Sequence, residues 1–143
     1  ILILDEPTAG LDPNERIRFR NLISELSEDR LVLLSTHIVS DIEYIANEIL
    51  LMKDGKLMHK GTADEIINSM TETVWECFVE KNMVSDFMKK YKISNMKSEA
   101  DGVILRIISH EKPFVNAQSV EASLEDVFLY YFGEKAGDEN AAI

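Results

Sequence analysis

Basic side chains, cysteine and long apolar runs are scarce in this sequence of 143 residues. Lys and Arg total 15 against 26 Asp and Glu, and the resulting net charge of −11 repels a phosphate backbone, which argues against general nucleic-acid binding. The single cysteine, Cys77, cannot close an internal disulfide, which favours a reducing compartment. No apolar run approaches the roughly 20 residues of a bilayer-spanning helix, so the sequence predicts no membrane crossing.

Two further patterns are missing. The chain opens on Ile1 inside an apolar run, without the charged and small-residue segments of a signal peptide. It also contains no GxxxxGK[ST] phosphate-binding loop, because its only Gly–Lys step, Gly55–Lys56, is followed by Leu57. The backbone N–H groups and the lysine with which such a loop holds phosphates are therefore absent from these residues.

What the sequence does contain is a pair of adjacent acids, Asp5 and Glu6, after the apolar run "ILIL". A continuous apolar run is typical of a parallel strand buried on both faces, and ligands of parallel sheets bind beyond the carboxyl ends of the strands. Neighbouring side chains point in different directions, so Asp5 can serve Mg²⁺ while Glu6 orients or deprotonates a water. A solvated strand end is the alternative interpretation.

A second apolar run, "LVLLS" at 31–35, completes a predicted strand–helix–strand unit. Asp12 as N-cap, Pro13 in the first turn and Glu15 three residues after the cap predict a helix that runs to about Glu28. His37 then follows the second strand at the same sheet edge as Glu6, where it can donate a hydrogen bond to a phosphate oxygen.

Further along the chain, alternating segments predict additional elements in two groups. A short helix at 41–47, a hairpin turning at Asp54–Gly55 and a helix that ends near Met70 complete the first group. The polar stretch 68–73 marks the predicted boundary. The second group consists of strands at 74–80 and 102–109 and helices at 83–91 and 123–132. We therefore predict an α/β domain at 1–70, a small α+β unit at 71–132 and a disordered tail at 133–143.

The motifs together carry a resemblance to a known family. "ILILDEPTAGLDP", followed by "LLSTHIVSDIEYIANEILLMKDGKLMHKGT", resembles the C-terminal half of an ABC transporter nucleotide-binding subunit over residues 1 to about 70. The resemblance implies that Asp5 ends the Walker B strand and holds Mg²⁺ through water, that Glu6 is the catalytic base and that His37 is the switch histidine. It also implies a D-loop, which meets the opposite subunit, at Ala9, Gly10, Leu11 and Asp12.

The same resemblance implies a fold, cofactors and partners. The fold is a partial P-loop NTPase sheet of the ABC type, followed by the small appendage, and the cofactors are ATP and Mg²⁺. The expected partners are a second nucleotide-binding subunit and a separate transmembrane permease, with no nucleic acid, at the cytoplasmic face of the membrane. The segment "SLEDVF" at 123–128 resembles the end of ATPase subunits of ABC-2 type exporters.

The missing phosphate loop, glutamine loop and LSGG-type signature leave alternatives open. The first interpretation is part of an ATP-hydrolysing transport subunit, inactive by itself and coupled to export. The second is a stand-alone, non-hydrolysing interaction module. A third, a DNA-repair or chromosome-organising ATPase, is opposed by the acidic composition and by the lack of coiled-coil heptads.

Overall fold

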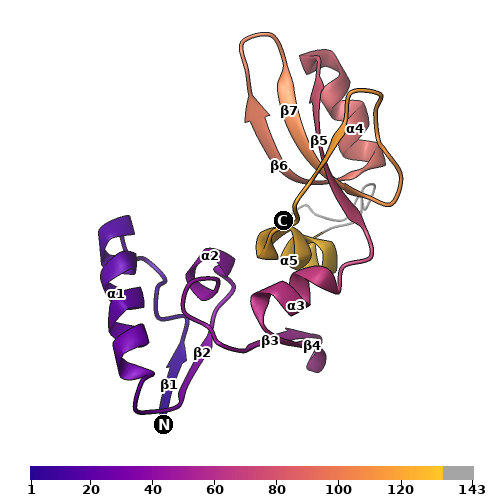
Figure 1. Ribbon diagram of the computed structural model, residues 1–143. Coiled ribbons are helices and arrows are strands. Elements are labelled where there is room, and N and C mark those ends of the chain that lie inside the picture. Colours follow the sequence, from indigo (N-terminus) through magenta and orange to yellow (C-terminus); the bar gives the residue numbers. More distant parts are fainter. Residues whose placement is uncertain (134–143) are drawn as a thin grey trace. The chain divides into compact units, whose positions relative to one another are not determined.

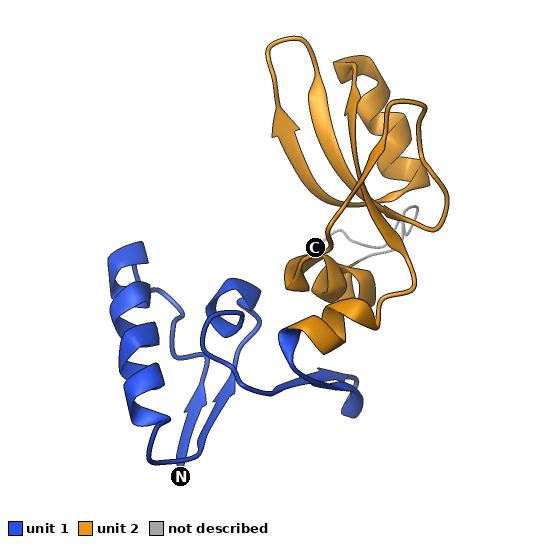
Figure 2. Cartoon of the chain, viewed as in Figure 1, with its two compact units in different colours: residues 1–63 blue, residues 64–143 orange. Residues whose placement is uncertain are grey.

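The computed structural model describes residues 1–133, and the chain divides into two compact units, 1–63 and 64–143 (Figure 2). Both units combine helices and strands, which confirms the predicted α/β class. Of the predicted tail, all but Gly133 lies outside the described residues. None of the helices within 1–133 is long and apolar enough to cross a membrane.

The first unit opens with a strand, a helix and a second strand (Figure 1). Strands β1 (Leu2–Asp5) and β2 (Val32–Ser35) pair in parallel, and helix α1 (Pro13–Leu26) connects them. The helix begins where predicted, because the Asp12 side chain accepts from the Glu15 N–H and the Glu15 side chain accepts from the Asp12 N–H. The sequence therefore specifies this βαβ unit locally.

Burial of the two strands alternates. Leu2 and Leu4 of β1 are half-buried, whereas Ile3 is 70% exposed and Leu33 of β2 is 51% exposed. The predicted burial of both faces is thus wrong for the described residues, because the continuous apolar run has a partly covered face and an open face.

The remainder of the first unit is a short helix and a hairpin. Helix α2 (Val39–Ile42) is shorter than the predicted helix, and strands β3 (Ile49–Lys53) and β4 (Lys56–Gly61) pair antiparallel. Between them, Asp54 at φ 51° and Gly55 at φ 73° have the left-handed backbone of a type I′ turn. The Asp-Gly signal therefore predicted the hairpin correctly.

The boundary between the two units lies earlier in the chain than the sequence predicted, after residue 63. Helix α3 (Ala63–Asn68) falls almost entirely in the second unit, whereas the predicted boundary followed it at 70/71. The polar stretch after α3 continues the helical hydrogen bonding, since Ser69 N–H donates to Glu65 O at 3.1 Å. Thr71 Oγ1 then lies 3.4 Å from Tyr130 Oη, within the second unit. Polar composition alone did not reveal these bonds.

The second unit is a four-stranded sheet in the order β6–β7–β5–β8, with every neighbouring pair antiparallel. Strands β5 and β6 both oppose β7, so β5, α4 and β6 form a split βαβ unit. The elements, in chain order, are β5 (Thr73–Val79), the 3₁₀ turn η1 (Lys81–Met83), α4 (Val84–Lys90), β6 (Lys92–Ser98), β7 (Val103–Ser109), β8 (Gln118–Val120) and α5 (Leu124–Phe132).

The core of the second unit lies between the sheet and α4. Phe87 of α4 is 7% exposed and packs edge-on against Phe114, with ring centroids 5.6 Å apart. The other buried members come from the sheet and the loop before β8: Cys77, Val79, Val103, Leu105, Ile107 and Ala117. Burial raises the pKa of the Cys77 thiol, so this cysteine stays protonated within the core.

Candidate functional site

The candidate site lies at the carboxyl ends of β1 and β2. Parallel pairing aligns Asp5 with Ser35, and Glu6 N–H donates to Ser35 O at 2.8 Å immediately beyond the sheet. The residues that follow each strand are thereby brought side by side, although about 30 positions separate them in the sequence. Asp5, Glu6 and His37, which sequence reasoning selected, share this edge.

Asp5 is exposed and has one side-chain partner. The Ser35 hydroxyl donates to Asp5 Oδ1, and within residues 1–133 the other carboxylate oxygen of Asp5 accepts no hydrogen bond. An exposed carboxylate beside a hydroxyl is an oxygen-rich environment of the kind that Mg²⁺ prefers. Asp5 is therefore free to bind a further ligand through one oxygen.

Glu6 is held through both carboxylate oxygens. Its Oε2 accepts from Thr36 Oγ1 at 3.0 Å, and its Oε1 accepts from the His37 backbone N–H at 3.1 Å. His37 Nδ1 lies 2.8 Å from the same Oε1 and donates, because an ionised carboxylate can only accept. The His37 side-chain hydrogen bond, above all, holds the pKa of Glu6 below its ordinary value of 4.5. Glu6 is thus ionised at neutral pH.

The Glu6 backbone is also unusual. Its φ of 44° lies in the left-handed region, which non-glycine residues seldom occupy. Strained backbone of this kind costs about 1–3 kcal/mol and clusters at functional sites. The hydrogen bonds that the Glu6 carboxylate accepts from Thr36 and His37, together with the one that the Glu6 N–H donates to Ser35 O, offset that cost and hold Glu6 at the sheet edge.

The predicted D-loop residues form the turn that leads from Glu6 to α1. Ala9 N–H donates to Glu6 O at 3.2 Å, and Gly10 has a φ of 80° that favours glycine. Leu11 N–H donates to Thr8 O at 3.2 Å, while the Asp12 carboxylate caps α1. The structure therefore brings this turn next to Glu6 through its backbone, while the Asp12 side chain is engaged with its own helix.

Sequence reasoning missed three polar residues around the acids. Ser35 and Thr36 hydrogen-bond to Asp5 and Glu6, respectively, and Thr8 in the turn is 1% exposed with no hydrogen-bond partner for its Oγ1. Two hydroxyl residues directly before His37, at the end of an apolar strand, were the available signal for Ser35 and Thr36. Their partners depend on the register of β1 against β2, which the sequence does not state.

A magnesium ion fits this edge only in part. The described residues contain no group of three or more His, Cys, Asp or Glu side chains placed to hold a metal. Mg²⁺ often binds one or two carboxylates together with substrate phosphates and water, and the free oxygen of Asp5 meets that requirement. The residues present therefore suit a nucleotide-bound Mg²⁺ rather than a protein-enclosed ion.

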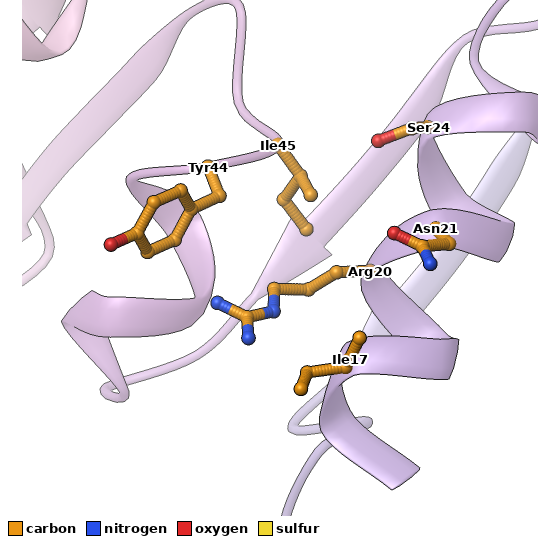
Figure 3. A pocket seen from close by; sticks show the side chains of 6 residues that line it. All are labelled: Ile17, Arg20, Asn21, Ser24, Tyr44 and Ile45. Atoms are coloured by element: carbon orange, nitrogen blue, oxygen red, sulfur yellow. The ribbon is translucent and has the colours of Figure 1, made fainter. Parts of the chain in front are cut away.

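A surface pocket of about 300 Å³ lies elsewhere in the first unit (Figure 3). The Arg20 guanidinium sits 5.0 Å from the centroid of the Tyr44 ring, and the remaining lining residues are Ile17, Asn21, Ser24 and Ile45. None of these residues belongs to the acid–hydroxyl–histidine cluster. The shape of this pocket therefore does not identify the candidate site.

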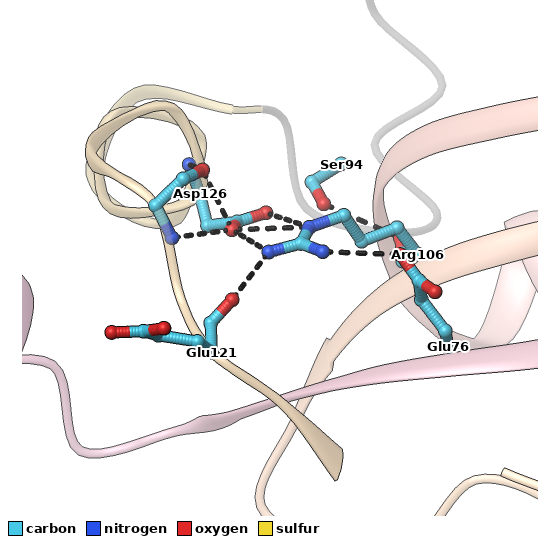
Figure 4. A network of polar contacts seen from close by, with 6 residues as sticks. Glu76, Ser94, Arg106, Glu121 and Asp126 are labelled. Carbon is cyan, nitrogen blue, oxygen red and sulfur yellow. Dashed lines mark hydrogen bonds and ion pairs between the residues drawn. The ribbon is translucent and has the colours of Figure 1, made fainter. Parts of the chain in front are cut away.

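A second polar cluster occupies the other unit and is centred on Arg106 (Figure 4). Arg106 Nη2 donates to Asp126 Oδ2 at 2.7 Å and to Glu121 O at 2.7 Å, while Nη1 donates to Glu76 Oε1 at 3.1 Å. Asp126 also accepts from the Ser123 N–H at 2.8 Å, within the capping box of α5. Because its donors and acceptors pair with one another, we interpret this cluster as the attachment of α5 to the sheet.

Curated proteins with similar sequences agree with the geometry of the first unit. The chain is 31% identical over 130 residues to an uncharacterized ABC transporter ATP-binding protein, MJ1023, of Methanocaldococcus jannaschii, covering 90% of this chain and 45% of that protein. The chain is a relative of the ABC transporter ATP-binding proteins. No protein-family model matches the chain.

Two other ABC relatives match shorter stretches. YxlF of Bacillus subtilis, an uncharacterized ABC transporter ATP-binding protein, is 33% identical over 82 residues, covering 57% of this chain and 28% of that protein. EcfA2 of Clostridioides difficile, an energy-coupling factor transporter ATP-binding protein, is 41% identical over 71 residues, covering 48% of this chain and 25% of that protein. The chain thus corresponds to between 25% and 45% of the length of these ABC relatives.

Proposed function

We propose that this chain forms part of the ATP-binding subunit of an ABC transporter and contributes the acid and histidine groups used in ATP hydrolysis. The observation that carries the proposal is the ionised Glu6, hydrogen-bonded to His37 beside the exposed Asp5 at one sheet edge. The ATP-binding relatives support it. The domain assignment is part of the proposal: the first unit belongs to the ATPase domain, and the second is an accessory unit.

In this proposal each residue has a separate task. Asp5 would hold, through water, the Mg²⁺ that accompanies the nucleotide, and that ion would supply positive charge against the phosphate oxygens. Glu6 orients a water and accepts one of its protons as the water oxygen bonds to the γ-phosphorus. The bond from that phosphorus to the bridging oxygen breaks, and ADP and inorganic phosphate are the products. His37 donates to a γ-phosphate oxygen.

The partners follow from the same proposal. The turn at Ala9–Asp12 faces a second nucleotide-binding subunit, and a separate transmembrane permease carries the transported molecule. The complex lies at the cytoplasmic face of the membrane. The "SLEDVF" segment at 123–128 supports an exporter of the ABC-2 type. These partners and this location are proposed because the relatives with similar sequences are transporter ATP-binding proteins.

The test is Glu6→Gln in the longest natural reading frame that contains these residues. We expect ATP binding to persist and steady-state turnover to fall by about 100-fold or more, because the amide keeps the shape of the side chain but does not accept a proton. Equilibrium binding of a fluorescent ATP analogue and phosphate release measure the two effects. Unchanged turnover would remove Glu6 from the mechanism. The 143-residue chain alone is expected to show no ATPase activity.

One alternative has a specific observation in its favour. These 143 residues contain no GxxxxGK[ST] loop, and a stand-alone interaction module that does not hydrolyse ATP would need none. This alternative predicts that Glu6→Gln changes neither nucleotide binding nor turnover in any assembly that contains the chain. The same two measurements therefore separate the two functions.

A further inference from the structure

Thr36 makes two hydrogen bonds that join the acid to the start of α2. Its Oγ1 donates to Glu6 Oε2 at 3.0 Å and accepts from the Ile38 backbone N–H at 3.1 Å. Ile38 is the N-cap residue of α2, and its own carbonyl accepts from the Asp41 N–H at 3.1 Å. The hydroxyl therefore links the Glu6 carboxylate to the first turn of the helix.

The direction of the Thr36 hydroxyl follows from its chemistry. A hydroxyl has a single hydrogen to donate, and the Ile38 N–H already points at its oxygen as a donor. The one hydrogen is left for Glu6 Oε2, which can only accept while it is ionised. Because Thr36 is half-buried and β-branched, its rotamer is also restricted. The bond to Oε2 is thus preorganised by the backbone of α2.

The two oxygens of Glu6 are held in different ways. Both contacts to Oε1 come from His37, whose side chain is 72% exposed, whereas Oε2 is held by the half-buried Thr36. A neutral imidazole that donates from Nδ1 carries no proton on Nε2. Neutral His37 therefore cannot donate from Nε2 to a phosphate while its Nδ1 donates to Glu6.

We propose that Thr36 is the positioning residue that keeps the Glu6 carboxylate in place through Oε2 when the His37 side chain leaves Oε1 to contact phosphate. Oε1 then becomes available to the attacking water, while Oε2 keeps its partner. This inference rests on the proposed function for the water and phosphate steps. The hold of Thr36 on Glu6 is a property of the described chain by itself.

The first test measures that hold directly in the 143-residue chain. We would compare the wild type with Thr36→Val, which removes the hydroxyl at nearly constant shape, and Thr36→Ser, which keeps it. Thr73→Val, at another half-buried threonine in the second unit, is the matched control. NMR side-chain relaxation and three-bond couplings of Glu6 report whether its carboxylate arm occupies one rotamer.

We expect a single ordered Glu6 rotamer in the wild type, in Thr36→Ser and in Thr73→Val, and rotamer averaging in Thr36→Val. The amide spectrum shows whether each variant is folded. A Glu6 side chain that stays equally ordered in folded Thr36→Val would overturn the inference. So would a Glu6 side chain that is already averaged in the wild type.

The second test measures turnover in the longest natural reading frame. We expect Thr36→Val to lower kcat by about tenfold with little change in KM, since positioning of the base acts on the chemical step, and Thr36→Ser to restore it. A wild-type kcat in Thr36→Val would overturn the inference. A wild-type protein without hydrolysis would instead contradict the proposed function, and the NMR comparison would still decide whether Thr36 holds Glu6.

Discussion

At the scale of single residues, Glu6 at the sheet edge combines a strained backbone with several hydrogen bonds to its carboxylate. Glu6 has a positive φ, yet it accepts three hydrogen bonds from the two residues that follow β2. A carboxylate that accepts several hydrogen bonds keeps its charge and its orientation, which are the two properties required of a group that directs a water. The strained backbone of Glu6 therefore occurs at the residue that we propose as the catalytic base.

At Asp126, burial and hydrogen bonding shift the pKa of the carboxyl group in opposite directions. Burial alone raises its pKa, but the hydrogen bonds from Arg106 and Ser123 outweigh burial, so the pKa of Asp126 lies below the ordinary value of 3.8. A carboxyl whose pKa is lowered by folding stabilises the protein above its unfolded pKa. That stabilisation is lost as the pH falls through the folded value.

We therefore predict that Asp126→Asn reduces the dependence of unfolding free energy on pH below about pH 4. The variant is also less stable than the wild type at pH 7, because the amide cannot pair with the Arg106 charge. Urea unfolding followed by the fluorescence of Trp75, in β5 of the same unit, measures both effects. Asp101→Asn, at an exposed bend of the same unit, is the control for replacing one aspartate by asparagine. Equal slopes for wild type and Asp126→Asn would contradict the prediction.

At the scale of elements, short sequence motifs predicted the starts of helices and the hairpin turn better than they predicted strands. The Asp12 and Ser123 capping boxes begin α1 and α5 as expected, because a cap is satisfied within four residues. Strand β6 was not predicted, since a register shift between Ile93 and Asn95 breaks its alternation. Strand β8 has three residues, which is too short for a periodic signal.

The attachment of α5 to the sheet through Arg106 is expected to make a large contribution to the unfolding free energy. Arg106→Ala leaves the 1%-exposed Asp126 without its charged partner, and breaking a buried pair in this way costs about 3 kcal/mol of unfolding free energy. The exposed pair of Lys97 and Glu99, at 2.8 Å in the same unit, supplies the control. Lys97→Ala should change stability by less than about 1 kcal/mol. Urea unfolding that shows equal losses for the two variants would refute the buried role of Arg106.

On the scale of the whole chain, the two units differ in how completely they bury apolar surface. The core of the second unit contains side chains with no exposure, such as Leu105 and Ile107. In the first unit the β1–β2 sheet exposes Ile3 and Leu33. Because buried apolar contacts set the free energy of local opening, the units are expected to open independently and at different free energies.

We predict that native-state hydrogen exchange of the 143-residue chain shows stronger amide protection in β5 and β7 than in β1 and β2. The expected difference is at least about tenfold in exchange rate, which corresponds to about 1.4 kcal/mol in the free energy of opening. Mass spectrometry of quenched peptides, or NMR, resolves the four strands. Equal protection in all four strands would show that the chain opens as one cooperative body.

By itself, the sequence determined the acidic character, the capped helices, the Asp54–Gly55 hairpin and the choice of Asp5, Glu6 and His37 as candidate residues. These features depend on composition or on interactions between residues close together in the chain. Only the tertiary structure decided that Thr36 and His37 hold Glu6, and that one face of the β1–β2 sheet is open. Both facts depend on which strands pair and in what register, and a one-residue shift would turn every strand side chain to the opposite face.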